Sequence, residues 1–283
     1  DPAVVVRVED EFGNQVLSAT NEVTVALEDT EFDYLELTGE TTIAAESGIA
    51  TFDALTFESP WHGYRLTAAS PGVDPATSEP FDATVEFTAF AASYATCALS
   101  AQGRIYCWGE NDDGLLGLGS VGSGDDQLVL SPAPLLGDLD ATVVVMGIQH
   151  TCALDVHGMA WCWGDNSDGE AGVGHSGSPV VQPTPVLHDY EYTDLAGGLY
   201  HTCGLRTDER IYCWGHNGNG QLGDSTFTPE RYEPAPTHGD MAFTTMDTGQ
   251  YHTCALDPDG TAWCWGTNWD GQLGIGNTEQ RVS

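Results

Sequence analysis

Eight cysteines between residues 97 and 264 are the side chains whose type and spacing point most clearly to chemistry. They form four pairs with nine residues between the partners: Cys97 and Cys107, Cys152 and Cys162, Cys203 and Cys213, and Cys254 and Cys264. Paired cysteines either form a disulfide or supply thiolates to a metal ion. Zinc sites prefer cysteines two to four residues apart, so the wider spacing favours disulfides. Disulfides in turn predict an oxidising compartment.

The turn between the partners supports this interpretation. Opposed residues of an antiparallel hairpin have a constant sum of residue numbers, which centres the hairpin of Cys97 and Cys107 on Gln102, within "SAQG". In the fourth pair the matching turn is "DPDG", where Pro258 and Gly260 suit a type I turn followed by a bulge. We therefore expect each cysteine to face its partner across one hairpin, close enough to bond.

Histidines and acidic loops are the remaining candidates for metal binding. His150, His201 and His252 each stand two residues before the first cysteine of a pair, where the first pair has Ala95. Three equivalent histidines could hold a metal on a shared axis, but the alanine breaks the symmetry of such a site. The loops "ENDDG" and "DNSDGE" resemble calcium loops only loosely, because the glycine spacing of a twelve-residue calcium loop is missing. We predict no metal site and no cofactor, and leave calcium open.

The chain contains no motif that is typical of catalysis. It has neither a G-x-S-x-G nucleophile elbow nor a phosphate-binding loop. The cysteines are assigned to disulfides, and among 43 acidic residues a pair of carboxylates carries little information. We predict that the protein is not an enzyme.

The charge balance limits the possible partners. The 283 residues include 43 acidic and only seven basic side chains, all of them arginine, for a formal net charge of −36. Such a surface repels phosphate backbones and anionic lipids, so we expect no binding to nucleic acid. No run of about 18 apolar residues occurs, so we expect no insertion into a membrane. The chain opens on "DPAVVVRVED" without a secretion leader, so we expect a mature or excised piece if the protein is secreted.

Two parts of the chain differ in composition, and the cysteines belong to the second. Residues 1–88 hold no cysteine and one tryptophan, whereas the rest holds eight cysteines and seven tryptophans. The first part alternates apolar and polar residues in short segments between turn residues, which predicts an antiparallel β-sandwich. The expected strands include Val4–Val8, Val23–Leu27, Thr41–Ala45, Ile49–Phe57, Tyr64–Ala68 and Thr84–Phe87.

Residues 1–88 resemble the immunoglobulin-like modules of bacterial surface and secreted proteins. The resemblance lies in "VVRVEDEFGNQV", "NEVTVALE", "LTGETTIAAESGIATFDALTF" and "GYRLTAASPG". It implies an immunoglobulin-like β-sandwich. Modules of this kind normally begin with one more strand, so we expect either a truncated N-terminus, which we favour, or a strand supplied by another chain.

Four repeats make up residues 89–283. Successive first cysteines lie 55, 51 and 51 residues apart, and each second cysteine is followed by a glycine-rich run such as "CWGENDDGLLGLG" or "CWGTNWDGQLGIG". A period of about 50 residues with several strands per unit predicts the blades of a β-propeller. Both sides of each hairpin are apolar, so we expect neighbouring blades to cover both. We place the units at 89–144, 145–194, 195–245 and, incomplete, 246–283.

The run H-T-C-A-L-x-x-x-G-x-x-x-C-W-G-x-N-x-x-G-Q-L-G is similar to the regulator of chromosome condensation repeat, in its bacterial, disulfide-bearing form. That family forms seven-bladed β-propellers, in which the histidine makes structural hydrogen bonds. The resemblance implies an all-β fold with a sandwich followed by four blades of a partial or truncated propeller. Four blades cannot close the family's ring alone. We expect either a fragment of a longer protein or an open arc completed by other chains.

The function is predicted from the surroundings and the fold together. Disulfides argue against the nucleus and the charge argues against DNA, so the family's nuclear roles are not carried over. Bacterial relatives with this repeat are extracellular. We therefore expect a bacterial, secreted or surface-displayed, non-enzymatic binding or adhesion scaffold whose propeller loops hold a protein or glycan ligand.

Trp269 is the candidate contact residue for such a ligand. The other units have Asp112, Ser167 and Gly218 at this position, so the blade does not require an indole there. Packing against an adjacent blade is the competing explanation. Two alternative functions also stay open: a self-associating subunit of an extracellular fibre, and a propeller lectin or glycan-active enzyme.

Overall fold

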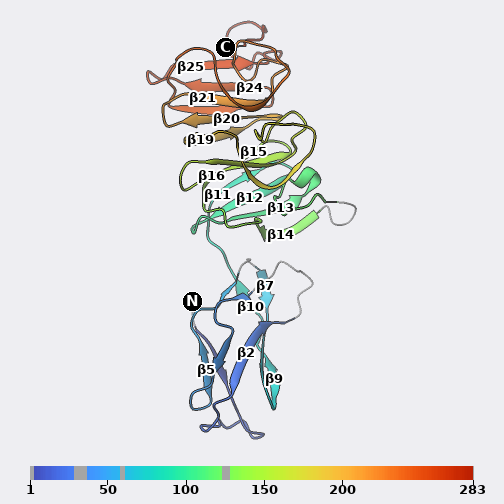
Figure 1. The fold of residues 1–283 in the computed structure, drawn as a ribbon, viewed down its shortest axis with the longest axis vertical. Helices are drawn as coiled ribbons and strands as arrows, with labels where there is room; N and C mark the ends of the chain where they lie inside the picture. Colours follow the sequence, from blue (N-terminus) through green and yellow to red (C-terminus); the bar gives the residue numbers. More distant parts are fainter. Residues whose placement is uncertain (1–2, 29–36, 58–60, 123–127, 283) are drawn as a thin grey trace. The chain divides into compact units, whose positions relative to one another are not determined.

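A computed structural model describes residues 3–28, 37–57, 61–122 and 128–282. Within these ranges every regular element is a β-strand except one short 3-10 turn, η1 (Asp112–Gly114), so the all-β prediction is confirmed. The chain divides into two compact units, Asp1–Val85 and Glu86–Ser283. No helix in the described ranges is long and apolar enough to cross a membrane. Figure 1 shows the strands of both units.

The first unit consists of short antiparallel strands. Four of them form one sheet in the order β4-β2-β8-β9, and the others pair as β1 with β5, β3 with β6 and β7 with β10. The bounds are β1 (Val4–Arg7), β2 (Glu22–Leu27), β3 (Leu37–Thr38), β4 (Thr42–Ala44), β5 (Ile49–Phe52), β6 (Thr56–Phe57), β7 (Trp61–Tyr64), β8 (Leu66–Ser70), β9 (Val73–Thr77) and β10 (Phe81–Ala83).

Alternation along these strands builds a small core. Val23 and Val25 of β2 are each 2% exposed, whereas Thr24 between them faces solvent, as a period of two along a strand requires. Ala50 and Phe52 of β5 are buried in the same cluster. The alternating segments therefore mark the buried face of this unit.

The boundary between the units differs from the expected one. The strand expected at Thr84–Phe87 does not form, because residues 84–86 lie outside any strand. Phe87 instead begins the first strand of the second unit, where it lies opposite Ser100. The physical reason is that alternation continues through "TVEFTAF" without a glycine or proline to mark the break.

The second unit is a row of four antiparallel sheets, one for each repeat (Figure 1). Blade 1 is β11 (Phe87–Ala92), β12 (Ala95–Ser100), β13 (Ile105–Glu110) and β14 (Leu128–Pro134); blade 2 is β15 (Ala141–Met146), β16 (His150–Asp155), β17 (Ala160–Gly164) and β18 (Val180–Pro185). Blade 3 is β19 (Tyr192–Gly197), β20 (His201–Arg206), β21 (Ile211–His216) and β22 (Glu230–Pro236); blade 4 is β23 (Thr245–Thr248), β24 (His252–Leu256) and β25 (Ala262–Gly266).

All four blades begin one to four residues before the unit boundaries proposed from the sequence. β15 begins at Ala141 and β19 at Tyr192, whereas the second and third units were expected to start at residues 145 and 195. The cysteine motif marks the middle hairpin of a blade. The strand that precedes this hairpin belongs to the same sheet and carries no motif of its own.

The middle hairpin of each blade holds one disulfide. Cys97 lies opposite Cys107, and the same register recurs in the other three blades. All four pairs are bonded, with their Cα atoms 4.1 Å apart. In blade 4 the Gly260 N–H donates to the Asp257 carbonyl oxygen at 2.9 Å, and Gly260 has a φ of 78°. These are the bonds and the turn that the spacing predicts.

The fourth strand of blades 1 to 3 is the proline-rich segment of each repeat, which the sequence does not mark as a strand. β14, β18 and β22 each contain two prolines and lie at the edge of their sheets. Proline lacks the N–H that a central strand donates, and strands therefore tolerate it mainly at edges. In blade 4 the corresponding segment makes one isolated bridge, between Gly266 and Arg281.

Neighbouring blades pack through two different faces. The cysteine face of a blade carries its disulfide and two flanking apolar residues, which in blade 1 are Leu99 and Ile105. The tryptophan face, on the other side of the same hairpin, carries the tryptophan that follows the second cysteine. In each of three buried clusters, the cysteine face of one blade packs against the tryptophan face of the next. The prediction that neighbours cover both sides of a hairpin is confirmed for blades 2 and 3.

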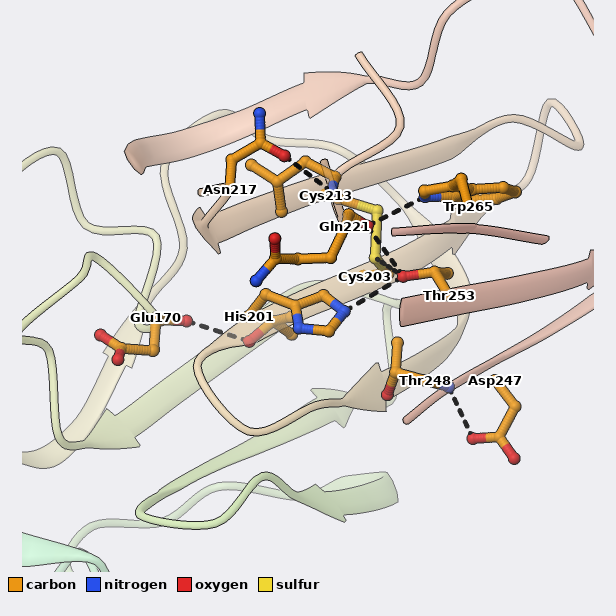
Figure 2. The surroundings of a disulfide bond; sticks show 12 residues. Glu170, His201, Cys203, Cys213, Asn217, Gln221, Asp247, Thr248, Thr253 and Trp265 are labelled. Atoms are coloured by element: carbon orange, nitrogen blue, oxygen red, sulfur yellow. Dashed lines mark hydrogen bonds between the residues drawn. A yellow bond between two sulfur atoms is a disulfide. The ribbon is translucent and has the colours of Figure 1, made fainter. Parts of the chain in front are cut away.

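Buried polar groups join the blades as well. In blades 2 to 4 the indole nitrogen of the tryptophan donates to one loop carbonyl of the preceding blade; the pairs are Trp163 with Leu115, Trp214 with Glu170 and Trp265 with Gln221, at 2.7–3.0 Å. A threonine hydroxyl donates to the same carbonyl in each case, from Thr151, Thr202 and Thr253. Figure 2 shows the Trp265 and Thr253 contacts on Gln221.

Candidate binding face

Two of the three histidines of the repeat lie inside blade junctions, and the third, His252, is half-buried in blade 4. His150 and His201 are buried, and their Nε2 atoms lie 2.9 Å from Thr202 Oγ1 and 3.1 Å from Thr253 Oγ1, respectively (Figure 2 shows the second pair). Burial lowers the pKa of His150 to about 4 and that of His201 to about 3. Each ring is therefore neutral near pH 7 and serves the packing between blades, as the resemblance implied.

The loops that resemble calcium loops are held by their asparagines. Asn166 accepts from the Ala171 N–H at 3.1 Å and donates to the His175 carbonyl oxygen at 2.9 Å. Asn111 accepts from the Leu116 N–H at 3.1 Å in the same way. The described ranges contain no group of three or more histidine, cysteine or acidic side chains arranged to hold a metal ion. The asparagine amides thus hold the backbone of these loops.

At one end of each hairpin, the segment before the histidine position lies beside the segment after the C-W-G motif. A backbone hydrogen bond joins the two segments. In blade 3 the His216 N–H, directly after the C-W-G motif, donates to the carbonyl oxygen of Tyr200 at 2.7 Å. In blade 4 the Thr267 N–H donates to the carbonyl oxygen of Tyr251 at 2.8 Å. The rings of Tyr200 and Tyr251, on adjacent blades, lie 6.1 Å apart, and His216 lies 6.4 Å from both. The stacking of blades 3 and 4 therefore creates an aromatic cluster.

Carboxylates of blades 2 and 3 lie near this cluster, and Asp113 of blade 1 lies near Asp165. Asp168 Oδ2 lies 3.5 Å from His216 Nδ1. Burial raises the pKa of Asp168, and the nearby carboxylates Glu230 and Asp165 add to the rise, while His216 opposes it. Burial and the charges of Asp165 and Asp112 likewise raise the pKa of Asp113. These raised pKa values indicate that the carboxylates at this end of the hairpins lie close enough to repel one another.

Trp269 belongs to the same end of the hairpins. It follows Thr267 by two residues and is 63% exposed in blade 4. We call this surface the loop face: Tyr94, Asp113, Asp165, Asp168, Tyr200, His216, Glu230, Tyr251 and Trp269. It combines aromatic rings with uncompensated carboxylates, which together suit a cationic or mixed polar and apolar partner.

The tyrosines of the loop face are not among the residues that the sequence analysis singled out. A comparison of repeat positions would have found them, because Tyr94, Tyr200 and Tyr251 occupy the same position in three of four units, where the second unit has Gln149. Glu170 was also overlooked. It is buried where the third unit has Gln221 and the fourth has Gln272.

Comparison with protein families agrees with this architecture. Two models of the regulator of chromosome condensation (RCC1) repeat match the chain, one at residues 142–170, 192–221 and 243–272, the other at 102–154 and 208–256. Together they cover more than half of the chain. The chain belongs to the RCC1 repeat family.

RCC1 relatives with curated names have varied roles. The chain is 34% identical over 188 residues to the RCC1 domain-containing protein RUG3, mitochondrial, of Arabidopsis thaliana, covering 64% of this chain and 42% of that protein. It is 28% identical over 191 residues to the ultraviolet-B receptor UVR8 of the same plant, again covering 42% of that protein. A probable E3 ubiquitin-protein ligase, human HERC6, is 28% identical over 176 residues. The chain thus spans less than half the length of these relatives.

Solved structures of RCC1 proteins share the fold. Human WBSCR16 superposes with a TM-score of 0.62 at 20% identity, covering 81% of this chain and 63% of that one. Prp20p from Saccharomyces cerevisiae, in a study that includes its binding to Gsp1p and histones, gives 0.64 at 19% identity, with 80% and 60% covered. RCC1 repeats thus occur in proteins named as a receptor and as a probable ligase. The four disulfides point to an oxidising compartment.

Proposed function

We propose that this chain is a non-enzymatic protein-binding scaffold, bacterial and secreted or displayed on the cell surface, that holds its partner on the loop face. The observation that carries the proposal is the aromatic cluster of Tyr200, His216 and Tyr251 beside the carboxylates of Asp165 and Asp168. The fold itself does not need His216, because the corresponding positions of the other blades hold Glu110, Asp165 and Thr267.

The chemistry of the loop face selects a cationic segment. Carboxylates with raised pKa values gain most when a lysine or arginine side chain neutralises them. Tyrosine and tryptophan rings attract the same cations through their faces. The chain has seven arginines and a formal net charge of −36, so it offers few cations of its own and attracts basic partners from a distance.

The first unit has a supporting role in this proposal. Its antiparallel strands with alternating burial and its sequence resemblance support an immunoglobulin-like sandwich. A sandwich of this kind would act as a spacer that presents the blades. The disulfides support the extracellular assignment, because bonds of this type persist outside reducing compartments.

A selection experiment tests the proposal. Random short peptides displayed on phage are selected on the immobilised chain, and the bound peptides are measured by fluorescence anisotropy against the wild type and its variants. We expect peptides enriched in lysine and arginine whose affinity falls with added salt. Both Trp269→Ala and the double variant Asp165→Asn, Asp168→Asn should weaken binding by about tenfold or more.

The matched control lies at the opposite end of the hairpins. Val156, in the turn of blade 2, is 60% exposed and far along the strands from the loop face, so Val156→Ala should bind like the wild type. Peptides that bind wild type and loop-face variants equally would contradict the proposal. So would peptides without basic residues.

A further inference from the structure

The loop face contains two tyrosines that come together only in the folded chain. The rings of Tyr200 and Tyr251 lie 6.1 Å apart and are tilted by 50° to each other. Both side chains are partly exposed. Within the described ranges the cation–π contacts of the chain involve neither ring. The two rings therefore form an inclined, accessible pair that faces no cation from the described part of the chain.

Blade 3 shows, at the turn end of its hairpin, what such a pair of rings binds. The guanidinium carbon of Arg206 lies 4.4 Å from the centroid of the Tyr190 ring and 4.8 Å from that of Tyr212. These two rings are 5.0 Å apart and tilted by 59°. Asp208 supplies the counter-charge, because its Oδ2 atom lies 3.1 Å from Arg206 Nη1. Two tilted tyrosines and one aspartate thus hold an arginine within this chain.

The tyrosine pair of the loop face has the spacing for the same group. Its centroids, 6.1 Å apart, are closer together than the sum of the two distances at Arg206, so one guanidinium carbon can lie 4.4–4.8 Å from both rings. A cation within about 6 Å of a tyrosine centroid is attracted by the face of the ring. The His216 ring, 6.4 Å from both tyrosines, borders a third side. The rings therefore suit a flat cation that contacts two faces at once.

Asp168 is the counterpart of Asp208 on the loop face. Its Oδ2 atom lies 3.5 Å from His216 Nδ1, and no arginine among the described residues pairs with it. Burial raises the pKa of Tyr200, with Tyr251 and three carboxylates of blade 2, Asp168 among them, adding to the rise. The aspartate therefore lies beside the tyrosine pair, as Asp208 lies beside the rings that enclose Arg206.

A buried acid accompanies Asp168. The Asp168 N–H donates to Glu170 Oε2 at 2.9 Å, whereas Glu170 Oε1 has no hydrogen-bond partner among the described residues and Glu170 is 0% exposed. In blades 3 and 4 a glutamine, Gln221 or Gln272, accepts the equivalent hydrogen bond, so the repeat does not require an acid at this position. The acid is specific to blade 2, and a cation bound at Asp168 would favour its ionised form.

We propose that Tyr200 and Tyr251 bind the guanidinium group of an arginine side chain of the partner protein, with Asp168 as its counter-ion. The assignment rests on the proposed function, because it names the group that the loop face recognises. Such an arginine lies between the two rings as Arg206 lies between Tyr190 and Tyr212.

The site selects arginine over lysine for two physical reasons. A guanidinium is planar and more weakly hydrated than an ammonium, so it loses less water when it stacks on a ring face. It also forms two parallel hydrogen bonds with one carboxylate, which Asp168 can accept. A lysine ammonium is a compact, strongly hydrated charge that gains less between two rings.

Fluorescence anisotropy with two matched probes tests the assignment on the full chain. The probes are labelled peptides of equal charge, one alternating glycine with arginine and the other glycine with lysine. We expect the wild type to bind the arginine peptide at least about fivefold more tightly. Tyr200→Leu and Tyr251→Leu should each remove most of this preference, whereas Tyr200→Phe keeps a ring and should retain more of it. Phe12→Leu, a matched change at an exposed aromatic residue of the first unit, should keep the full preference.

Proton magnetic resonance of the bound arginine peptide gives a second readout that needs no variant. Protons above a ring face move upfield because of the ring current, so the arginine side-chain methylenes should shift upfield when the wild type is added. Unshifted methylenes in a peptide that is bound would overturn the assignment.

The outcomes separate this assignment from the proposed function. Equal affinities for the two peptides, which fall together in the double variant Asp165→Asn, Asp168→Asn, would overturn the arginine assignment but leave the loop face as the binding surface. Affinities that respond to none of the loop-face variants would contradict both.

Discussion

The indole nitrogen of Trp214 donates to the backbone carbonyl oxygen of Glu170 at 2.7 Å, across the junction between blades 2 and 3. The Thr202 hydroxyl donates to the same oxygen at 3.0 Å, and all three residues are 0% exposed. One loop carbonyl therefore anchors the next blade twice in a fully buried site. The stability of the array should accordingly behave as a sum over such junctions.

Removal of the indole nitrogen tests this anchor. Trp214→Phe leaves the Glu170 carbonyl with one donor fewer and a gap beside it, and should lower the free energy of unfolding by about 2–4 kcal/mol. The measurement is urea unfolding followed by circular dichroism. Trp108→Phe is the control, because the structure gives the Trp108 indole no hydrogen-bond partner among the described residues. This change should lower the free energy of unfolding by much less. Equal losses from both changes would contradict the anchoring role.

The buried carboxyl of Glu170 predicts a loss of stability toward alkaline pH. Burial raises its pKa from the ordinary value of 4.5 to about 8, with Asp165 and Asp168 adding to the rise. The folded state thus holds a proton that the unfolded state releases, so the free energy of unfolding should fall as pH rises from about 4.5 to about 8. Glu170→Gln should remove this decline, on the order of a few kcal/mol.

The matched variant for this prediction is Gln221→Glu, which places a carboxyl at the equivalent buried position of blade 3. It should add a second decrease in the free energy of unfolding as pH rises. Thermal unfolding midpoints across this pH range provide the measurement. A Glu170→Gln protein with an unchanged pH profile would show that Glu170 is ionised in the folded state.

Buried histidines predict a loss of stability as pH falls. The pKa of His201 is lowered from 6.5 to about 3, chiefly by burial, so the folded state resists a proton that the unfolded state binds. The contribution of His201 to stability is complete above pH 6.5 and is lost as pH falls toward about 3. His201→Gln should keep a hydrogen-bonding side chain and flatten the acid side of the stability profile. A steeper acid loss in the variant would contradict this account.

Exposure predicts the order in which the disulfides are reduced. Cys254 and Cys264 are half-buried, whereas the other six cysteines are fully buried. In dilute native protein, limited reductant followed by alkylation and peptide mass spectrometry should label the blade 4 pair first. Removing the Cys152–Cys162 bond by changing both cysteines to alanine should lower the free energy of unfolding by about 3 kcal/mol.

The sequence was most informative where local rules decide the structure. The constant sum of residue numbers and the "DPDG" turn were enough to predict the pairing of Cys254 with Cys264 and the position of Gly260. Apolar residues on both sides of the hairpin predicted the packing between blades. These features depend on strand alternation and turn chemistry, which act over a few residues.

The remaining features depend on long-range packing. The edge strands were missed because prolines such as Pro134 normally indicate loops. The cluster of Tyr200, His216 and Tyr251 forms only when two blades, whose tyrosines are 51 residues apart in sequence, stack side by side. The burial of Glu170 was equally hidden, because a glutamate in an acidic chain gives no local sign that it will be enclosed.

Hydrogen exchange with a selected peptide bound tests the central claim, that the loop face is where this RCC1 scaffold holds a partner. The bound peptide should slow exchange at residues 199–201, 214–217, 249–252 and 266–270, which lie at one end of the hairpins of blades 3 and 4. Exchange in the turns at 156–158, 207–209 and 258–260 should be unchanged. Protection confined to those turns, or to the first unit, would contradict the account.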